Sequence, residues 1–199
     1  MNLPNKLTVL RIILTPIFML TLVWQFPYHY LVSLIIFIGA SITDLLDGKI
    51  ARSRGLVTDF GKFLDPLADK MLTTAAFLGF IALGIGHGVV WIAFIVLFRE
   101  FAVSSIRLIA STSGGKVIAA NIWGKLKTVF QMIAIIFALT EKQFLEILSK
   151  FSINPDVFGL IETILVTCTS VFLWISAILC IISGVIYIID NKDFVKQTK

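Results

Sequence analysis

The sequence predicts an all-α, polytopic membrane protein with about six transmembrane helices and a short N-terminal interfacial segment. Of its 199 residues, 58% are hydrophobic and only 15% are charged. Apolar stretches of about 20 residues, the length that crosses a bilayer, recur along the chain. The connections between them contain no low-complexity tract, and there is no internal repeat. We therefore expect a single domain over residues 1–199.

The first three expected spans occupy residues 8–24, 31–51 and 61–83. Pro16 is expected to break the first span, because proline removes a backbone donor from a helix interior. Pro66 lies inside the third span, where a cavity or a ligand can satisfy the carbonyl that the proline leaves free. The aromatic run at residues 27–30 predicts an interfacial turn between the first two spans.

The remaining expected spans cover residues 89–110, 118–139 and 157–189, after a glycine-rich turn at residues 84–88. Residues 140–156 mix polar and apolar side chains, so we expect an interfacial segment that ends at Asn154 and Pro155. The last span is longer than a bilayer needs. Its length predicts a tilt, an extension beyond the lipid or a short re-entrant break.

The charges predict the orientation of the chain. The formal net charge is +5, and basic residues gather at 6–11, 49–62, 107–127 and 192–199. With six spans, these clusters and both termini fall on one side, which the positive-inside rule places in the cytoplasm of a multi-pass protein of the cell membrane. His29 and His87 fall on the opposite side. Nucleic-acid binding is not expected, because no basic surface with aromatic platforms lies outside the spans.

Four aspartates at the cytoplasmic ends of the second and third spans carry the strongest functional signal. Asp44 and Asp47 share one helix face, because residues three apart are neighbours on a helix. Asp65 and Asp69, four apart, share another. An aspartate inside a membrane helix costs about 2.5–3.5 kcal/mol unless it is compensated. If residues 53–60 join the two helices in an antiparallel hairpin, the four carboxylates converge, and such oxygen ligands suit two Mg²⁺ or Mn²⁺ ions.

Small residues accompany the aspartates. Gly48 and Ala51 continue the face of the first pair, and Gly61 begins the face of the second. A position without a side chain lets a bulky ligand approach the backbone. The alternatives are a small-residue seam for helix packing and ordinary capping charges at the membrane surface. Four carboxylates in two facing pairs favour the functional interpretation.

This stretch resembles the signature of the CDP-alcohol phosphatidyltransferase family at all eight of its positions: Asp44, Asp47, Gly48, Ala51, Arg52, Gly61, Asp65 and Asp69. The resemblance implies a membrane enzyme whose four aspartates hold two divalent ions, with Asp69 also acting as the catalytic base. It implies that Gly48, Ala51, Arg52 and Gly61 line the site of the CDP-lipid. A homodimer, common in the family, is a further expectation carried over from the resemblance.

Three more residues are candidates for the CDP-lipid site. The segment at residues 3–11 resembles the stretch that many family members place beside the nucleotide, which implies contacts from Asn5 and Thr8. A plain helix start, with Pro4 in its first turn, is the alternative. Thr58, between the two acidic pairs, has a hydroxyl that can donate to a diphosphate. An ordinary loop threonine is the alternative there.

A second set of charges predicts the acceptor. Arg99 and Arg107 lie about two turns apart on nearly the same helix face and, with Glu100, interrupt the fourth span. Intramembrane arginines are functional candidates by default. Lys116 and the run at residues 124–128, which contains Lys125 and Lys127, add cations at the cytoplasmic end. A pocket this basic suits a phosphorylated acceptor, because guanidinium groups bind phosphate bidentately. Apart from Arg99, these cations are also compatible with the anchoring of helix ends.

The acceptor-side sequences, residues 98–108 and 124–132, look like those of the phosphatidylglycerophosphate-forming branch of the family. The implied reaction joins CDP-diacylglycerol and glycerol 3-phosphate to give phosphatidylglycerophosphate and CMP. Inositol phosphate, serine and phosphatidylglycerol are alternative acceptors. Two other classes compete: an aspartate-rich intramembrane prenyltransferase, which lacks the glycine, alanine and arginine pattern, and a cation carrier, whose carboxylates are spread across the bilayer depth.

Overall fold

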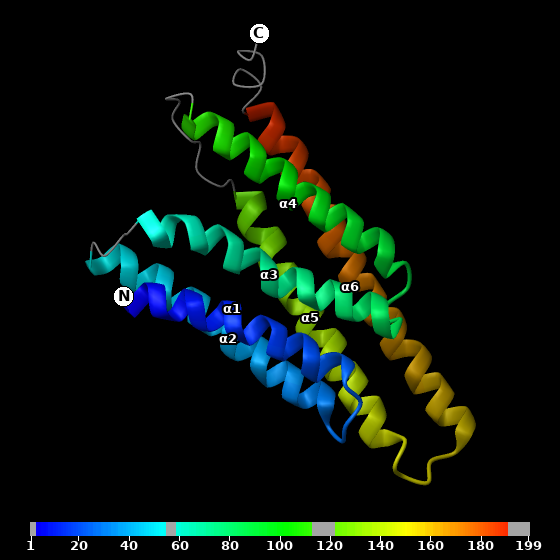
Figure 1. Ribbon diagram of the computed structural model, residues 1–199. Helices are drawn as coiled ribbons and strands as arrows, with labels where there is room; N and C mark the ends of the chain where they lie inside the picture. Colours follow the sequence, from blue (N-terminus) through cyan, green and yellow to red (C-terminus); the bar gives the residue numbers. More distant parts are fainter. Residues whose placement is uncertain (1–2, 55–58, 113–121, 191–199) are drawn as a thin grey trace.

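The computed structural model describes residues 3–54, 59–112 and 122–190, with the backbone alone at residues 3–4, 45–54, 59–63, 65–66, 69 and 107–112. Across these residues the chain forms six α-helices and no strand, which confirms the predicted all-α class (Figure 1). The helices are α1 (Leu3–Val23), α2 (His29–Arg54), α3 (Asp59–Leu83), α4 (Val89–Thr112), α5 (Ile122–Leu148) and α6 (Pro155–Asp190).

Within the described residues, four helices are long and apolar enough to cross a membrane. The apolar segments are Asn5–Val23 in α1, Val89–Ile106 in α4, and the whole of α5 and α6. Among the residues whose side chains the structure describes, α2 and α3 have shorter apolar stretches, His29–Asp44 and Lys70–Leu83. The membrane class is thus confirmed, and the expected spans match helices α1 to α6 in order.

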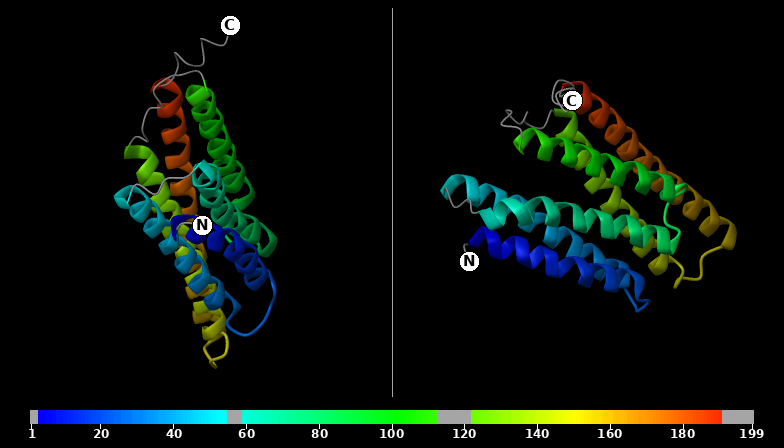
Figure 2. Two further views of the ribbon diagram at one scale, coloured as in Figure 1. Left: turned by 60° about the vertical axis from the view of Figure 1, so that its left-hand side comes forward. Right: turned by 45° about the horizontal axis from the view of Figure 1, so that its top comes forward.

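Successive helices alternate in direction (Figures 1 and 2). The start of α1, the end of α2 and the start of α3 therefore lie toward the same end of the bundle as the end of α6 (Figure 1). α1 packs along both α2 and α3, whereas α2 and α3 touch each other only sparsely. The helices α4, α5 and α6 form a second group, in which α6 packs along the other two. α2 of the first group packs against α5 of the second.

The core between the first helices is made of aromatic and small residues. The rings of Phe18 on α1 and Phe37 on α2 lie 5.6 Å apart between centroids, and both side chains are fully buried. A side-chain carbon on Gly79 of α3 would come within 2.3 Å of Leu22 Cδ2. The glycine thus leaves room for Leu22, and close packing of this kind stabilises helix pairs within a membrane.

α1 runs through Pro16 without a break, so the expected interruption is wrong. The carbonyl freed by a proline is tolerated in a membrane helix where neighbouring groups re-satisfy the backbone. Pro16 frees the carbonyl of Ile12, and the Thr15 hydroxyl donates to the adjacent carbonyl, that of Arg11, at 2.9 Å. The short N-terminal segment forms the first turns of this same helix, which begins at Leu3.

α5 continues to Leu148, so the expectation of an interfacial segment is wrong for residues 140–148. The polar side chains in this part of α5 bond to neighbouring helices. Buried Glu141 accepts the Thr169 hydroxyl of α6, and Gln143 Oε1 accepts the Leu31 amide of α2 at 2.8 Å. Satisfied polar groups allow the helix to continue. α6 is unbroken over 36 residues, about 54 Å of helix, so it contains no re-entrant break.

Candidate functional site

The acidic motif lies on two consecutive helices at one end of the bundle (Figure 1). Positions 44 and 47 fall in the second half of α2, and positions 65 and 69 fall in the first half of α3. The two helices run in opposite directions, as the expected hairpin requires. They contact each other only sparsely, and α1 packs against both. α1 is therefore the third helix that borders this region.

Asp44 is the motif aspartate whose side chain the structure describes, and it forms an ion pair with Arg11 of α1. The Arg11 side chain is 2% exposed, whereas that of Asp44 is 41% exposed. A guanidinium buried this deeply in a membrane protein is costly unless a carboxylate compensates it. The pair fastens the middle of α1 to the acidic part of α2.

Two more polar residues of α1 are buried. Asn5 and Thr8 are 7% and 1% exposed, and together with Arg11 they occupy about 120° of the helix circumference. Asn5 and Thr8 are the residues that the N-terminal resemblance suggested as contacts of the CDP-lipid. The alternative of a helix start holds as well, because α1 begins at Leu3.

The other motif side chains lie outside the part that the structure describes. The structure describes only the helical backbone at eight of the predicted site positions: Asp47, Gly48, Ala51, Arg52, Gly61, Asp65, Asp69 and Arg107. Two more, Thr58 and Lys116, lie outside the described residues altogether. Among the side chains that are described, no group of three or more His, Cys, Asp or Glu is placed to hold a metal ion. The convergence of the four carboxylates therefore stays a prediction.

A second charged cluster forms where α3, α4, α5 and α6 meet. Glu100 of α4 pairs with its neighbour Arg99 at 3.2 Å and with Lys127 of α5. The Arg99 guanidinium also donates to Ser183 Oγ of α6 at 2.6 Å. Lys70 of α3 donates to the backbone carbonyl oxygen of Glu100 at 3.2 Å. We call Lys70, Arg99, Glu100 and Lys127 the Glu100 cluster.

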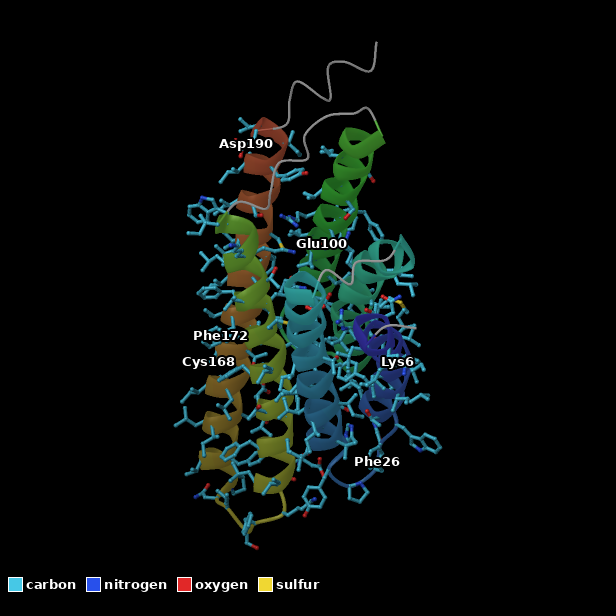
Figure 3. All side chains as sticks on the ribbon, turned by 90° about the vertical axis from the view of Figure 1, so that its left-hand side faces the viewer. Lys6, Phe26, Glu100, Cys168, Phe172 and Asp190 are labelled. Atoms are coloured by element: carbon cyan, nitrogen blue, oxygen red, sulfur yellow. The ribbon has the colours of Figure 1, made fainter. Side chains whose placement is uncertain are left out.

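The charged side chains of the Glu100 cluster are largely buried. The side chains of Arg99, Glu100 and Lys127 are 12%, 14% and 9% exposed. Figure 3 shows Glu100 in the half of the bundle that contains Asp190, away from Phe26 at the α1–α2 turn. Among the described side chains, the cluster brings three cations to one carboxylate. Such a group can bind an anion such as a phosphate.

The cluster contains one residue that the sequence singled out for the acceptor, Arg99, and others that it did not. Lys70 had no assigned role, Lys127 counted only as one of the cations in the run at residues 124–128, and Glu100 was noticed only as an interruption of the span. Lys125 is exposed, whereas Lys127 is buried. Two residues correspond to about 200° around a helix, so the rotation of α5 turns Lys127 inward and Lys125 outward. The order of lysines in the sequence carries no such signal.

The opposite end of the bundle has polar contacts of its own. His29 Nδ1 lies 3.1 Å from the Leu22 carbonyl oxygen, and His87 Nδ1 lies 2.9 Å from Ser170 Oγ. A cavity of about 510 Å³ at this end is lined by Gln25, Phe26, Pro27, His29, Tyr30, Glu146 and Lys150. Both histidines therefore have local partners away from the acidic motif.

The fold defines a polytopic α-helical membrane protein with two polar regions. One is the acidic motif on α2 and α3, and the other is the Glu100 cluster. The chain belongs to the CDP-alcohol phosphatidyltransferase family, whose sequence profile matches residues 1–190. All eight positions of the acidic motif lie inside this range. The resemblance inferred from the motif is thereby confirmed at the level of the family.

Individual relatives align along most of the chain. The CDP-diacylglycerol--glycerol-3-phosphate 3-phosphatidyltransferase of Bacillus subtilis is 36% identical, over 99% of this chain and 98% of its own. The protein of the same name from Rickettsia bellii is 34% identical over 97% of both chains. A probable phosphatidylglycerophosphate synthase of Mycobacterium tuberculosis is 42% identical over 67% of this chain and 64% of its own.

Proposed function

We propose that this protein transfers the phosphatidyl group of CDP-diacylglycerol to glycerol 3-phosphate, forming phosphatidylglycerophosphate and releasing CMP. The observation that carries the proposal is the similarity to a relative named for that reaction, 36% identical over 99% of this chain. An alignment of that length includes both the acidic motif and the Glu100 cluster. The similarity therefore extends over the regions assigned here to the donor and to the acceptor.

The four motif aspartates would hold two Mg²⁺ or Mn²⁺ ions. Their carboxylate oxygens are the ligands that these hard cations prefer. Asp44, which pairs with Arg11, is 41% exposed, and this exposure supports its assignment as a ligand. When bound, the ions reduce the repulsion between the diphosphate and an incoming oxygen, and they stabilise the charge on the leaving phosphate.

Asp69 is assigned as the general base. A hydroxyl of glycerol 3-phosphate attacks the phosphorus that carries the diacylglycerol, the bond from this phosphorus to the CMP oxygen breaks, and the hydroxyl proton passes to the base. A positioned carboxylate can accept it. Both histidines have partners at the far end of the bundle. The CDP-lipid is assigned to Asn5, Thr8, Gly48, Ala51, Arg52, Thr58 and Gly61.

The acceptor phosphate is assigned to Arg99, with Arg107, Lys116 and Lys125 as further cations. The cations gathered in the Glu100 cluster support a phosphorylated acceptor. A neutral acceptor such as serine has no phosphate oxygens to accept from these donors. Phosphate supplies the opposite charge and accepts hydrogen bonds from a guanidinium fork.

The orientation and assembly of the protein follow as proposals. Both termini and the active site face the cytoplasm in a multi-pass protein of the cell membrane, surrounded by membrane lipids. The start of α1 and the end of α6 lie toward the same end as the acidic motif, which supports this orientation (Figure 1). Residues 1–199 form one domain, and two chains form a homodimer, as the family resemblance suggests.

An acceptor screen tests the proposed reaction. Purified protein in vesicles that contain CDP-diacylglycerol is supplied with glycerol 3-phosphate, inositol phosphate, serine or additional phosphatidylglycerol, and CMP release and the lipid product are measured. We expect rapid CMP release with glycerol 3-phosphate alone among these. Preference for another acceptor would contradict the acceptor assignment. An aspartate-rich prenyltransferase or a cation carrier would release no CMP with any of them.

A further inference from the structure

The Glu100 cluster gathers two of its cations around one carboxylate oxygen. Arg99 Nη1, at 3.2 Å, and Lys127 Nζ both donate to Glu100 Oε1. Like charges in a poorly solvated interior repel each other, and the shared carboxylate offsets the repulsion between Arg99 and Lys127. Glu100 therefore helps to set where these two cations lie.

A third cation, Lys70, binds to the backbone of Glu100. Lys70 Nζ donates to the Glu100 carbonyl oxygen at 3.2 Å and to the Ser104 hydroxyl, one turn further along α4. Ser104 in turn donates to the same carbonyl oxygen at 2.7 Å. Lys70 directly follows Asp69 in α3, so this contact holds the part of α3 that carries the assigned base against α4.

Arg99 is also held from the side of α6. Ser183 Oγ accepts a hydrogen bond from Arg99 Nη2 at 2.6 Å. A side-chain carbon on the next residue, Gly184, would lie 3.0 Å from Arg99 Cγ. The glycine thus gives the arginine stem room to cross α6. The guanidinium is oriented by Glu100 on one side and by Ser183 on the other, and such a fixed fork suits phosphate.

We propose that Glu100 is a positioning residue that sets the phosphate-binding geometry of Arg99 and Lys127 and thereby selects a phosphorylated acceptor. Arg99 and Lys127 bring charged donors to one place. A phosphate can accept charge-assisted hydrogen bonds from both, and an uncharged head group cannot do so as strongly. Glu100 acts through its partners and does not itself touch the acceptor. The inference rests on the proposed function and deepens it.

The test compares Glu100→Gln with Glu146→Gln in the full-length protein. Glu146 also pairs with a lysine, Lys150 at 3.1 Å, but at the opposite end of the bundle, so it is a matched control. KM and kcat are measured separately for glycerol 3-phosphate and for CDP-diacylglycerol. Glu100→Gln should raise KM for glycerol 3-phosphate about tenfold, the usual effect of losing one charge-assisted hydrogen bond. KM for CDP-diacylglycerol, and both values in Glu146→Gln, should change less than about twofold.

Two further variants keep the test decisive if Glu100→Gln does not fold. Glu100→Asp keeps the charge but withdraws it by one methylene, and it should raise KM for glycerol 3-phosphate about threefold, a smaller loss than Gln causes. In a Lys127→Met background, Glu100→Gln should raise KM for glycerol 3-phosphate by less than it does in the unmodified protein, because residues that act together are not additive.

Three results would overturn the inference: an equal rise in both KM values, an unchanged KM for glycerol 3-phosphate in the Glu100 variants, or a fully additive effect in the Lys127→Met background. The failure of the proposed function is a separate observation, made before any variant is compared. If the unmodified protein releases no CMP with glycerol 3-phosphate, the proposed reaction is wrong, and the inference that rests on it falls too.

Discussion

Arg11, buried in α1, forms an ion pair with Asp44, the first aspartate of the acidic motif on α2. The contact joins the N-terminal helix to the region assigned to the metal ions. The Arg11 side chain is 2% exposed and that of Asp44 is 41% exposed, so the arginine holds the carboxylate from the protein interior. Arg11 therefore supports the motif although it is absent from the motif's sequence pattern.

Replacing Arg11 by Met should weaken Mn²⁺ binding and lower kcat/KM by about 10–100-fold, the usual effect of removing a group that orients a metal ligand. Metal binding is measured as the rise in Tm on adding Mn²⁺, which does not depend on turnover. Lys6→Met, an exposed position on the same helix, is the control and should leave both quantities unchanged. An Arg11→Met protein with undiminished Mn²⁺ affinity would show that the ion pair only fastens α1 to α2.

Replacing Asp69 by Asn should abolish turnover, with a loss of at least about 100-fold, because the amide cannot accept the hydroxyl proton. Binding of the CDP-lipid should persist in part, since several other residues are assigned to it. Turnover is followed as CMP release, and lipid binding is followed as the rise in Tm with CDP-diacylglycerol. Turnover close to that of the unmodified protein would remove Asp69 as the base.

Gly184→Ala should raise KM for glycerol 3-phosphate by about two- to fivefold, because a small displacement of a substrate-binding group has effects of at least this size. The added carbon would lie 3.0 Å from Arg99 Cγ, so the arginine must shift. Gly159→Ala on the same helix is the matched control, since nothing lies within 4 Å of its added carbon. Both changes favour helix formation equally. Equal KM values in the two variants would contradict a role for the Arg99 position.

The number and order of helices could be predicted from hydropathy, because each helix must keep its apolar side chains in lipid. The residue at which α5 ends could not be predicted from hydropathy. Glu141 and Gln143 look like interfacial residues in the sequence, yet they bond to Thr169 of α6 and the amide of Leu31 in α2. Polar residues that find partners on other helices leave no local signal of their own. The same limit applies to Pro16, which α1 accommodates.

The acidic motif could also be predicted, because its spacing follows the period of a helix and matches a family signature. The residues around it could not. A lone arginine at position 11 looks like an anchor at the start of a helix, and its pairing with Asp44 depends on how α1 packs against α2. The burial of Lys127, with Lys125 left outside, depends on the rotation of α5. Tertiary packing decides both.

The most direct test is formation of phosphatidylglycerophosphate before and after divalent cations are supplied. Protein freed of metal by a chelator is given CDP-diacylglycerol and glycerol 3-phosphate, and the lipid product and CMP are both measured. We expect neither without added metal and equal amounts of both once Mg²⁺ or Mn²⁺ is added, because the carboxylate site needs its cations to neutralise the diphosphate. An undiminished rate in the chelated protein, or CMP release without the lipid product, would contradict the proposed reaction at this site.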